Sequence, residues 1–336
     1  MTGAPLVSVV TPSFDPGARM LRCLDSIARQ TYSNVEHIVV DGGSNDGTVE
    51  LLRANGIRFI SEPDLGQTNA LNKGFAIASG AYLGWLNADD VLLPEAIERA
   101  VAAFAADADV GWVYGDCDVH RDGERSLRLR PPRRLGRHAL DNGNVIPQPG
   151  TLIARWALDR VGNMDEAFNL AMDYDLWVRL LDAGIRAAYV PETIAVFEIH
   201  AASKSGSIGL SEFVREEALA LLKSGRPREA ALACGRAAAV AARNEHGMVE
   251  PAPLQSEVGR VLREVAERIP ALDARVIASA AYAEAGVLEL HSSLRGLRHL
   301  ARPEPWRYGV TRRRMASAAR LEAARVFGRA ASRAAR

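Results

Sequence analysis

Two adjacent carboxylates follow an apolar segment of the sequence, and something must balance their charge. Residues 81–86 form a strand-like apolar run that ends in Asn87-Ala88-Asp89-Asp90. Adjacent carboxylates repel each other, and at the end of a buried strand they would also lose hydration. A divalent cation removes the repulsion, because Mg²⁺ and Mn²⁺ prefer oxygen ligands and commonly bridge a carboxylate to phosphate oxygens. The alternative is that the aspartates cap the helix that Pro94 opens, which explains one carboxylate but not two.

Polar residues and glycines also end the first two predicted strands. The first strand leads into Thr11-Pro12-Ser13-Phe14, and the second into Asp41-Gly42-Gly43-Ser44-Asn45-Asp46-Gly47. In an open α/β sheet, ligands bind outside the carboxyl ends of the strands, so a nucleotide would lie against these segments. Glycines allow close backbone approach, and the Asp41 carboxylate can accept hydrogen bonds from a base or a ribose. The alternative for the second segment is a tight turn in which Asp46 caps a helix.

These segments require strands that end together, and the hydrophobic pattern predicts such a sheet. Over the first 120 residues, short apolar strands alternate with segments of helical spacing; the predicted strands are 6–10, 35–40, 57–60, 81–86 and 110–114. Helices are predicted at 48–55, at 70–78 and from Pro94 onward. The alternation is typical of an α/β fold with a parallel sheet covered on both faces.

The second half of the chain predicts a loop, a return of the alternation, and then helices. Residues 121–150 are basic and proline-broken at first and then rich in Asn, Gly and Pro, which predicts a loop over the sheet edge. A helix at 172–184 and strands at 187–190 and 194–199 follow. After Ser211 the chain is rich in Ala, Leu, Glu and Arg and reads as helices to its end.

Charge and composition bound the function classes. The 336 residues have a formal net charge of zero, but residues 301–336 hold ten arginines against two glutamates, so this tail is +8 and the rest −8. A basic tail on an acidic body predicts an anionic partner for the tail, not a nucleic-acid enzyme. From 311 to 336 a basic amphipathic helix is plausible, which predicts peripheral contact with an anionic membrane. A solvated or self-packed helix is the alternative.

The sequence also predicts a cytoplasmic protein. Its three cysteines are far apart and form no pair, which argues for a reducing compartment. The N-terminus lacks the basic and apolar regions of a signal peptide, and no apolar window is long enough to span a membrane. We therefore expect a soluble protein that contacts the inner face of the membrane at most peripherally.

Four segments, in order, resemble family 2 glycosyltransferases of the GT-A fold: VSVVTPSFD, VEHIVVDGGSNDGTVELL, SEPDLGQTNALNKGFAIASGAYLGWLNADD and AMDYDLWVRLL. The resemblance covers roughly residues 5–205. It implies a GT-A domain over residues 1–210, with a nucleotide-binding, mostly parallel sheet, and leaves residues 211–336 as a helical C-terminal extension with the basic tail. It also implies a non-processive enzyme, since no QxxRW-like signature is present.

The resemblance assigns roles to residues of the strand ends. Thr11, Pro12, Phe14, Asp41 and Gly42 would hold the nucleoside of a nucleotide sugar. Asn87 and Ala88 begin the segment at the DxD position, Asp89 and Asp90 would bind the Mn²⁺ or Mg²⁺ ion, and His200 would add a further ligand. Asp173 would be the general base. Gln67 stands where relatives often carry Arg, so neutralisation of the diphosphate would fall to the metal and to Lys73.

The implied reaction is an inverting, metal-dependent transfer of a sugar from a nucleotide donor to a hydroxyl. The resemblance places it in cell-wall or polysaccharide biosynthesis, with a glycan or a lipid-linked glycan as acceptor. Two departures bear on the donor site: Asn87 replaces the first Asp of the DxD pattern, and Phe14 stands where Tyr is frequent. The alternative function is a catalytically inactive module that binds sugar nucleotides or glycans.

Overall fold

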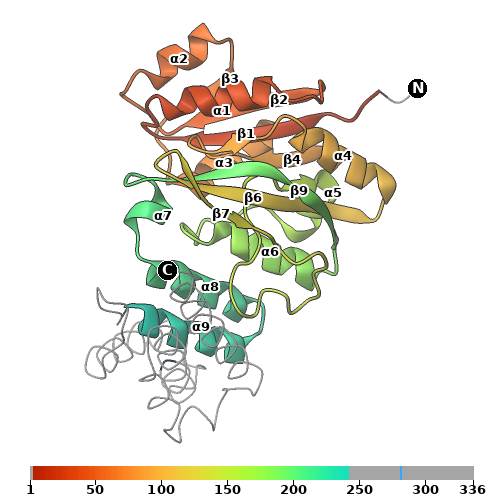
Figure 1. Ribbon diagram of the computed structural model, residues 1–336, viewed down its shortest axis with the longest axis vertical. Helices are drawn as coiled ribbons and strands as arrows, with labels where there is room; N and C mark the ends of the chain where they lie inside the picture. The colour runs from red at the N-terminus through yellow and green to blue at the C-terminus, as the bar shows by residue number, and fades with distance from the viewer. Residues whose placement is uncertain (1–2, 242–280, 282–336) are drawn as a thin grey trace, which may run out of the picture. The chain divides into compact units, whose positions relative to one another are not determined.

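The computed structural model describes residues 3–241 and residue 281, and its centre is one nine-stranded sheet (Figure 1). The strand order is β3-β2-β1-β4-β8-β6-β9-β5, and β7 pairs with β6 off this path. The strands are β1 (Val7–Ser13), β2 (Val35–Asp41), β3 (Arg58–Ser61), β4 (Tyr82–Trp85), β5 (Val91–Leu92), β6 (Val110–Arg121), β7 (Glu124–Leu129), β8 (Leu152–Ala154) and β9 (Arg186–Ile199). Six of the nine run in the same direction, and β5, β7 and β8 run against them.

Nine helices lie among and after the strands in the described part of the chain. They are α1 (Arg19–Ala28), α2 (Thr48–Ala54), α3 (Gln67–Ile77), α4 (Ala96–Ala106), α5 (Arg155–Val161), α6 (Met172–Asp182), α7 (Lys204–Ser207), α8 (Leu210–Lys223) and α9 (Pro227–Ala241). The expected α/β fold is therefore present. Its first four strands in space, β3-β2-β1-β4, are joined by parallel pairing alone, so their carboxyl ends meet at one edge.

The two faces of the sheet are covered by different helices because successive strand residues point to opposite sides. Val39 of β2 packs with Met20 and Leu24 of α1 and with Leu52 of α2. The opposite face carries α3, which approaches so closely that a Cβ on Gly74 would lie 2.3 Å from Val10 Cγ1. Gly74 is thus fixed by packing, and the helix sits directly on β1.

A stack of aromatic side chains joins α6 to the sheet. The Trp177 ring lies 5.7 Å from that of Trp85 and 5.1 Å from that of Trp112, centroid to centroid, at interplanar angles of 22° and 11°. All three rings are buried. Trp85 and Trp177 are therefore core residues, and the stack fixes α6 relative to the end of β4.

This stack gives a stability prediction. Trp177→Ala should lower the free energy of unfolding by about 3–5 kcal/mol, because a buried indole is replaced by a cavity. The buried Trp177 Nε1 has no hydrogen-bond partner among the described residues, so Trp177→Phe leaves no polar atom behind and should cost less than about 2 kcal/mol. Urea unfolding followed by tryptophan fluorescence measures both; equal losses would show that the indole volume is not what matters.

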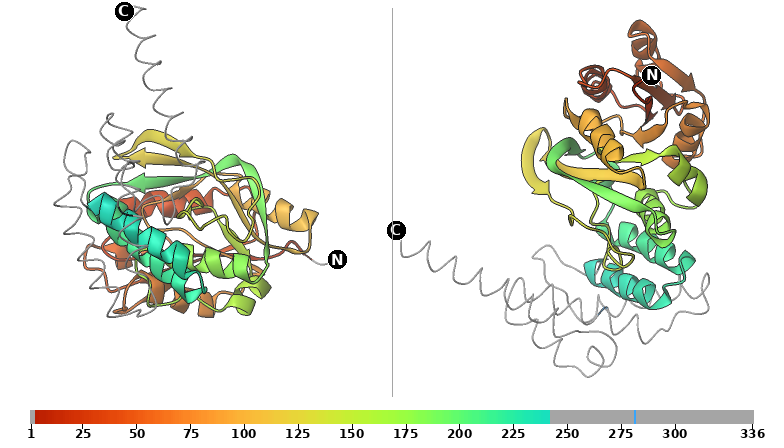
Figure 2. Two further views of the ribbon diagram at one scale, coloured as in Figure 1. Left: turned by 90° about the horizontal axis from the view of Figure 1, so that it is seen from below. Right: turned by 90° about the vertical axis from the view of Figure 1, so that its right-hand side faces the viewer.

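The expectation of a loop over residues 121–150 is wrong for its first part. Residues 124–129 form β7, which pairs antiparallel with the distal half of β6, and β6 itself extends to Arg121 instead of ending near residue 114. The alternation of Leu127 and Leu129 with arginines is a strand pattern, but the basic composition hid it. In Figure 2 this hairpin, in yellow, projects from the sheet.

The two strands expected at 187–190 and 194–199 form one strand, β9. Its pairing with β6 shifts register around Asp116, and this irregularity accommodates Pro191 and Glu192 within a continuous strand. The two-residue β5, the three-residue β8 and the short helix α5 were not predicted. They are too short to show a periodicity of their own.

The chain divides into two compact units, Met1–Leu140 with Asn144–Ser207, and Asp141–Gly143 with Ile208–Arg336. In the second unit, α8 and α9 pack through small side chains such as Ala218, Ala230 and Ala237, which confirms helices there. The basic tail at 301–336 lies outside the described residues. Over the part of the chain that is described, every helix is too short or too polar to cross a membrane.

Candidate active site

An open cavity of about 550 Å³ lies at the carboxyl ends of the strands. Its walls come from the segments that follow β1, β2, β3 and β4, and from the end of β9 with the residues after it. This is the location expected for a ligand in a sheet of this type. Eight of the residues singled out from the sequence line it: Pro12, Phe14, Gly42, Gln67, Asn87, Ala88, Asp89 and His200.

The loops after β1 and β2 are tied together by side-chain oxygens. Asp41 is fully buried, and its carboxylate accepts hydrogen bonds from the Ser44 backbone N–H (3.0 Å), the Ser44 hydroxyl and the Ser61 hydroxyl (2.8 Å). The Ser44 hydroxyl in turn accepts the backbone N–H of Asp15 at 2.8 Å. Asp41 thus shapes the loop instead of lining the cavity, and Gly42 forms the wall.

A Cβ at Gly42 would lie 2.8 Å from Asp64 Oδ2, so a larger residue there would displace the Asp64 side chain. Further along the same loop, Asp46 Oδ1 accepts hydrogen bonds from the backbone N–H (3.1 Å) and the hydroxyl of Thr48, and Asp46 Oδ2 accepts the Gly17 N–H (2.8 Å). The alternative considered for this segment, a tight turn with Asp46 near the N-terminus of a helix, is therefore present before α2. It coexists with a cavity wall made by the same segment.

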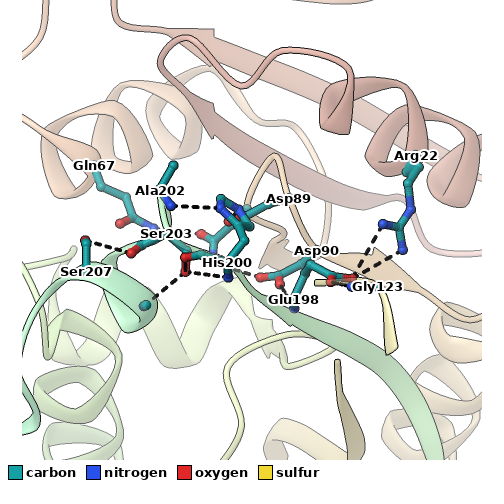
Figure 3. A network of polar contacts seen from close by, with 12 residues as sticks. Arg22, Gln67, Asp89, Asp90, Gly123, Glu198, His200, Ala202, Ser203 and Ser207 are labelled. Carbon is teal, nitrogen blue, oxygen red and sulfur yellow. Dashed lines mark hydrogen bonds and ion pairs between the residues drawn. The ribbon is translucent and has the colours of Figure 1, made fainter. Parts of the chain in front are cut away.

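Asp89 and His200 meet on the cavity wall. His200 Nε2 lies 3.1 Å from Asp89 Oδ2, and the backbone N–H of Ala202 donates to His200 Nδ1 at 3.2 Å (Figure 3). Because Nδ1 accepts, Nε2 carries the proton that it shares with Asp89. A cation bound between these two atoms would take the place of that proton.

The pair fits a divalent cation that also binds substrate oxygens. Within the described residues no group of three or more His, Cys, Asp or Glu side chains is placed to hold a metal ion. Mg²⁺, however, is usually held by one or two carboxylates together with substrate phosphates, and imidazole with carboxylate also suits Mn²⁺. Two protein ligands on an open wall therefore suffice only if the substrate supplies the others.

Asp90 is buried behind this wall. Its Oδ1 accepts the backbone N–H of Glu198 at 3.0 Å, and its Oδ2 accepts the Asn87 side-chain N–H at 2.9 Å. Burial, and then the charge of Asp89, raise the pKa of Asp90 well above its usual value. Asp90 thus links the segment after β4 to β9, and neither it nor Asp89 caps α4, whose N-cap is Glu95.

The Glu198 carboxylate continues this network away from the cavity. Its Oε1 accepts the Gly123 N–H at 2.6 Å, and its Oε2 lies 3.4 Å from Arg22 of α1 (Figure 3). Toward the cavity, Asn87 Oδ1 accepts the Gln67 side-chain N–H at 2.7 Å. The network therefore fixes the Asn87–Asp90 segment from both sides.

Asp173 begins α6 and is partly exposed. Its Oδ2 accepts the Asn144 side-chain N–H at 2.8 Å. The same loop carries Gln148, whose Oε1 lies 3.4 Å from Asn87 Nδ2, so one loop touches both Asp173 and the cavity wall. Asp175, in contrast, is buried in an ion pair with Arg179 at 2.8 Å and has a structural role.

Five of the residues expected at the site do not line the cavity: Thr11, Asp41, Lys73, Asp90 and Asp173. The Thr11 side chain is buried and interacts with His37 Nε2 at 2.8 Å. Lys73 Nζ pairs with Glu62 at 2.6 Å and donates to the Pro63 carbonyl at 3.3 Å. Conversely, Arg19, Asp64, Asn169 and Lys204 line the cavity but were not singled out: Asp64 lies in one of the quoted segments without an assigned role, and the other three lie outside those segments.

Comparisons with known proteins point to one family. The model of the family described as "Glycosyl transferase family 2" matches residues 8–160. An uncharacterized glycosyltransferase of Mycobacterium tuberculosis is 33% identical over 201 residues, which cover 58% of this chain and 74% of that protein. A chondroitin synthase of Escherichia coli is 28% identical over 187 residues, and the match spans 54% of this chain but only 27% of that protein's length.

Solved structures share the fold at low sequence identity. S. aureus TarS residues 1–349 in complex with UDP-GlcNAc give a TM-score of 0.59 at 15% identity, covering 88% of each chain. The mannosyltransferase PcManGT of Pyrobaculum calidifontis, in complex with GDP-Man and Mn²⁺, gives 0.50 at 18% identity and covers 96% of this chain and 85% of its own. These likenesses identify the architecture.

Proposed function

Because the chain belongs to glycosyl transferase family 2, we propose that its cavity binds a nucleoside diphosphate sugar and that the protein transfers the sugar, with inversion, to a hydroxyl of an acceptor. The observation that carries the proposal is the convergence of Phe14, Asn87 and the Asp89–His200 pair on one cavity at the strand ends. We assign the activity to residues 1–210.

The nucleoside would lie against the segments after β1 and β2. Pro12 and Phe14 form one wall of the cavity and Gly42 another, and the Phe14 side chain is 69% exposed. A large exposed ring beside a polar cavity can stack on a base, whereas the buried Asp41 would act by holding the loop.

Phe14→Ala should therefore weaken nucleoside diphosphate binding about 10-fold, as expected for the loss of one base–aromatic stack. Phe14→Tyr keeps the ring and should bind as the wild type does. The matched control is Leu127→Ala, which removes another exposed apolar side chain, on β7, away from the cavity. Calorimetric titration with UDP and with GDP measures all four proteins; an unchanged affinity in Phe14→Ala would exclude stacking.

Asp89 and His200 would hold a Mn²⁺ or Mg²⁺ ion together with the donor's phosphate oxygens. Bound there, the ion would supply charge stabilisation to the departing diphosphate. The chain's own contribution is to keep the two ligands together, which the Asp90–Glu198 link and the Ala202 N–H do from behind. Asn87, anchored to Gln67 and Asp90, would accept a hydrogen bond from a ribose hydroxyl of the donor through its Oδ1.

Asp173 would act as general base. It stands at the start of α6, where the aromatic stack and the hydrogen bond from Asn144 fix it. A carboxylate in this role accepts the proton of the acceptor hydroxyl as the hydroxyl oxygen attacks the sugar carbon. The bond from that carbon to the diphosphate oxygen breaks with inversion, and the nucleoside diphosphate leaves.

One experiment separates this proposal from an inactive binding module. The protein is titrated calorimetrically with UDP-sugars and GDP-sugars in Mn²⁺, and release of the nucleoside diphosphate is then followed with the donors that bind. We expect binding followed by slow hydrolysis, in which water takes the place of the acceptor. Heat without release would favour the binding module.

The family and the charge of the tail support a proposal for the acceptor and the place of action. We propose a glycan or lipid-linked glycan acceptor, in cell-wall or polysaccharide biosynthesis, on the cytoplasmic side of the membrane. The tail at 301–336, net +8, would hold the protein at anionic lipids.

The membrane proposal predicts salt-sensitive co-sedimentation with vesicles that contain anionic lipid. Binding should disappear when residues 306–336 are deleted, since each arginine near such a surface contributes about 1 kcal/mol. Vesicles of neutral lipid are the control. A full-length protein that stays in the supernatant at low salt would remove the membrane role and leave the donor site untouched.

A further inference from the structure

The cavity has a lysine that the sequence did not single out. Of the described residues that line it, Arg19 and Lys204 are the lysine or arginine side chains. Arg19 follows Phe14-Asp15-Pro16 at the end where the nucleoside would lie. Lys204 follows His200 and Ser203 in the sequence, and His200 Nε2 faces Asp89. Of the two cations, Lys204 is therefore the nearer in sequence to a proposed metal ligand.

Lys204 is bonded to Asn169, which also lines the cavity. Its Nζ donates to the Asn169 backbone carbonyl at 2.7 Å and to the Asn169 side-chain oxygen at 3.0 Å. That side-chain oxygen also approaches Gly66, where an added Cβ would lie 3.5 Å from it. Gln67 follows and binds Asn87. Asn169 thus holds the ammonium group near the start of α3.

The acidic lining of the cavity favours a cation beside a bound diphosphate. Asp15, Asp64 and Asp89 all line it, so a doubly charged diphosphate would enter a wall that is already acidic. Gln67 is uncharged, and Lys73 is engaged with Glu62 outside the lining. A lysine ammonium is a compact point charge that suits phosphate oxygens, and the positive end of the α3 helix dipole adds to it.

We propose that Lys204, and not Lys73, is the side chain that binds the diphosphate of the donor, and that Asn169 positions it. This rests on the proposed function, because it assigns a role within the same donor site. It predicts that Lys204 contributes to the affinity for diphosphates and not to the affinity for the nucleoside part.

The test compares binding of UDP and GDP with binding of uridine and guanosine by calorimetry, in Mn²⁺ and again in EDTA. Lys204→Gln should weaken binding of the preferred nucleoside diphosphate about 10- to 100-fold, the range of a charge-assisted hydrogen bond, and leave nucleoside binding unchanged. Lys204→Arg should retain most of the affinity. The matched control is Lys73→Gln, which should bind as the wild type does.

Several results would overturn the assignment. Unchanged diphosphate affinity in Lys204→Gln, or an equal loss in Lys73→Gln, would remove Lys204 from the site. An equal loss for the nucleoside would indicate general damage to the cavity. A loss seen only in Mn²⁺ would mean that Lys204 acts through His200. If the wild type binds neither UDP nor GDP, the proposed donor site itself fails and this inference with it, an outcome distinct from tight binding that Lys204→Gln leaves unaltered.

Discussion

Replacing Asp89 by alanine should remove most turnover, with a fall of about 10³-fold or more, since loss of a metal-held charge costs several kcal/mol in the transition state. Asp89 is the carboxylate that lines the cavity, and its Oδ2 faces His200 Nε2 at 3.1 Å. EDTA should have the same effect on the wild type, and Mn²⁺ or Mg²⁺ should restore activity. The measurement is release of nucleoside diphosphate from a donor sugar.

Two controls make this result specific. Asp109→Asn removes a carboxylate that is 84% exposed and pairs with Arg186 on the surface, and it should leave turnover unchanged. Melting curves show whether Asp89→Ala is folded. Full wild-type activity in EDTA would contradict the hypothesis that turnover needs a metal ion. Full activity of Asp89→Ala would exclude Asp89 as a ligand of that ion.

Asp173→Asn should lower turnover about 10²- to 10⁴-fold while donor affinity stays close to that of the wild type. Asparagine keeps the shape of the side chain and its position at the start of α6, but its amide cannot accept the proton of the acceptor hydroxyl. The Asn144 side-chain N–H that now donates to Asp173 Oδ2 can still donate to an amide oxygen. Steady-state transfer rates and calorimetric donor titrations together measure the two quantities.

Asp182→Asn is the matched control, because it makes the same change at the other end of α6, where Asp182 pairs with Arg137 near the surface. It should cost little in either quantity. Asp175→Asn should instead lower stability, since it breaks the buried pair with Arg179. If donor binding collapsed in Asp173→Asn, that carboxylate would be a nucleotide ligand or a structural residue, and not the base.

The wall residues could be predicted from the sequence because parallel strands end at one edge. Asn87 and Asp89 follow one short apolar run, and Gly42 follows another. The residue types of each segment indicate its chemistry without knowledge of its tertiary contacts. His200 came from the family resemblance alone. The structure adds that His200 touches Asp89, which no spacing in the sequence could show across 111 residues.

Other roles could not be predicted because they depend on partners distant in the sequence. Asp41 and Asp90 carry the same carboxylate group as Asp89. Their carboxylates, however, accept hydrogen bonds from hydroxyl and amide donors inside the protein. Lys73 forms an ion pair with Glu62 and does not line the cavity, whereas Lys204 lines it and donates a hydrogen bond to Asn169. The strand β7 was missed because the basic composition of its segment hid the alternation of Leu127 and Leu129 with arginines.

The most direct test of the donor site uses nuclear magnetic resonance to follow the Mn²⁺-dependent consumption of a nucleotide sugar by the full chain. The anomeric proton of the released sugar, or of its product on an acceptor, is followed as the UDP-sugar or GDP-sugar that binds is consumed. The account predicts Mn²⁺-dependent consumption with inverted anomeric configuration in the first-formed product, absent in Asp89→Ala. Donor binding with no consumption in the presence of Mn²⁺, or consumption with retained configuration, would contradict it.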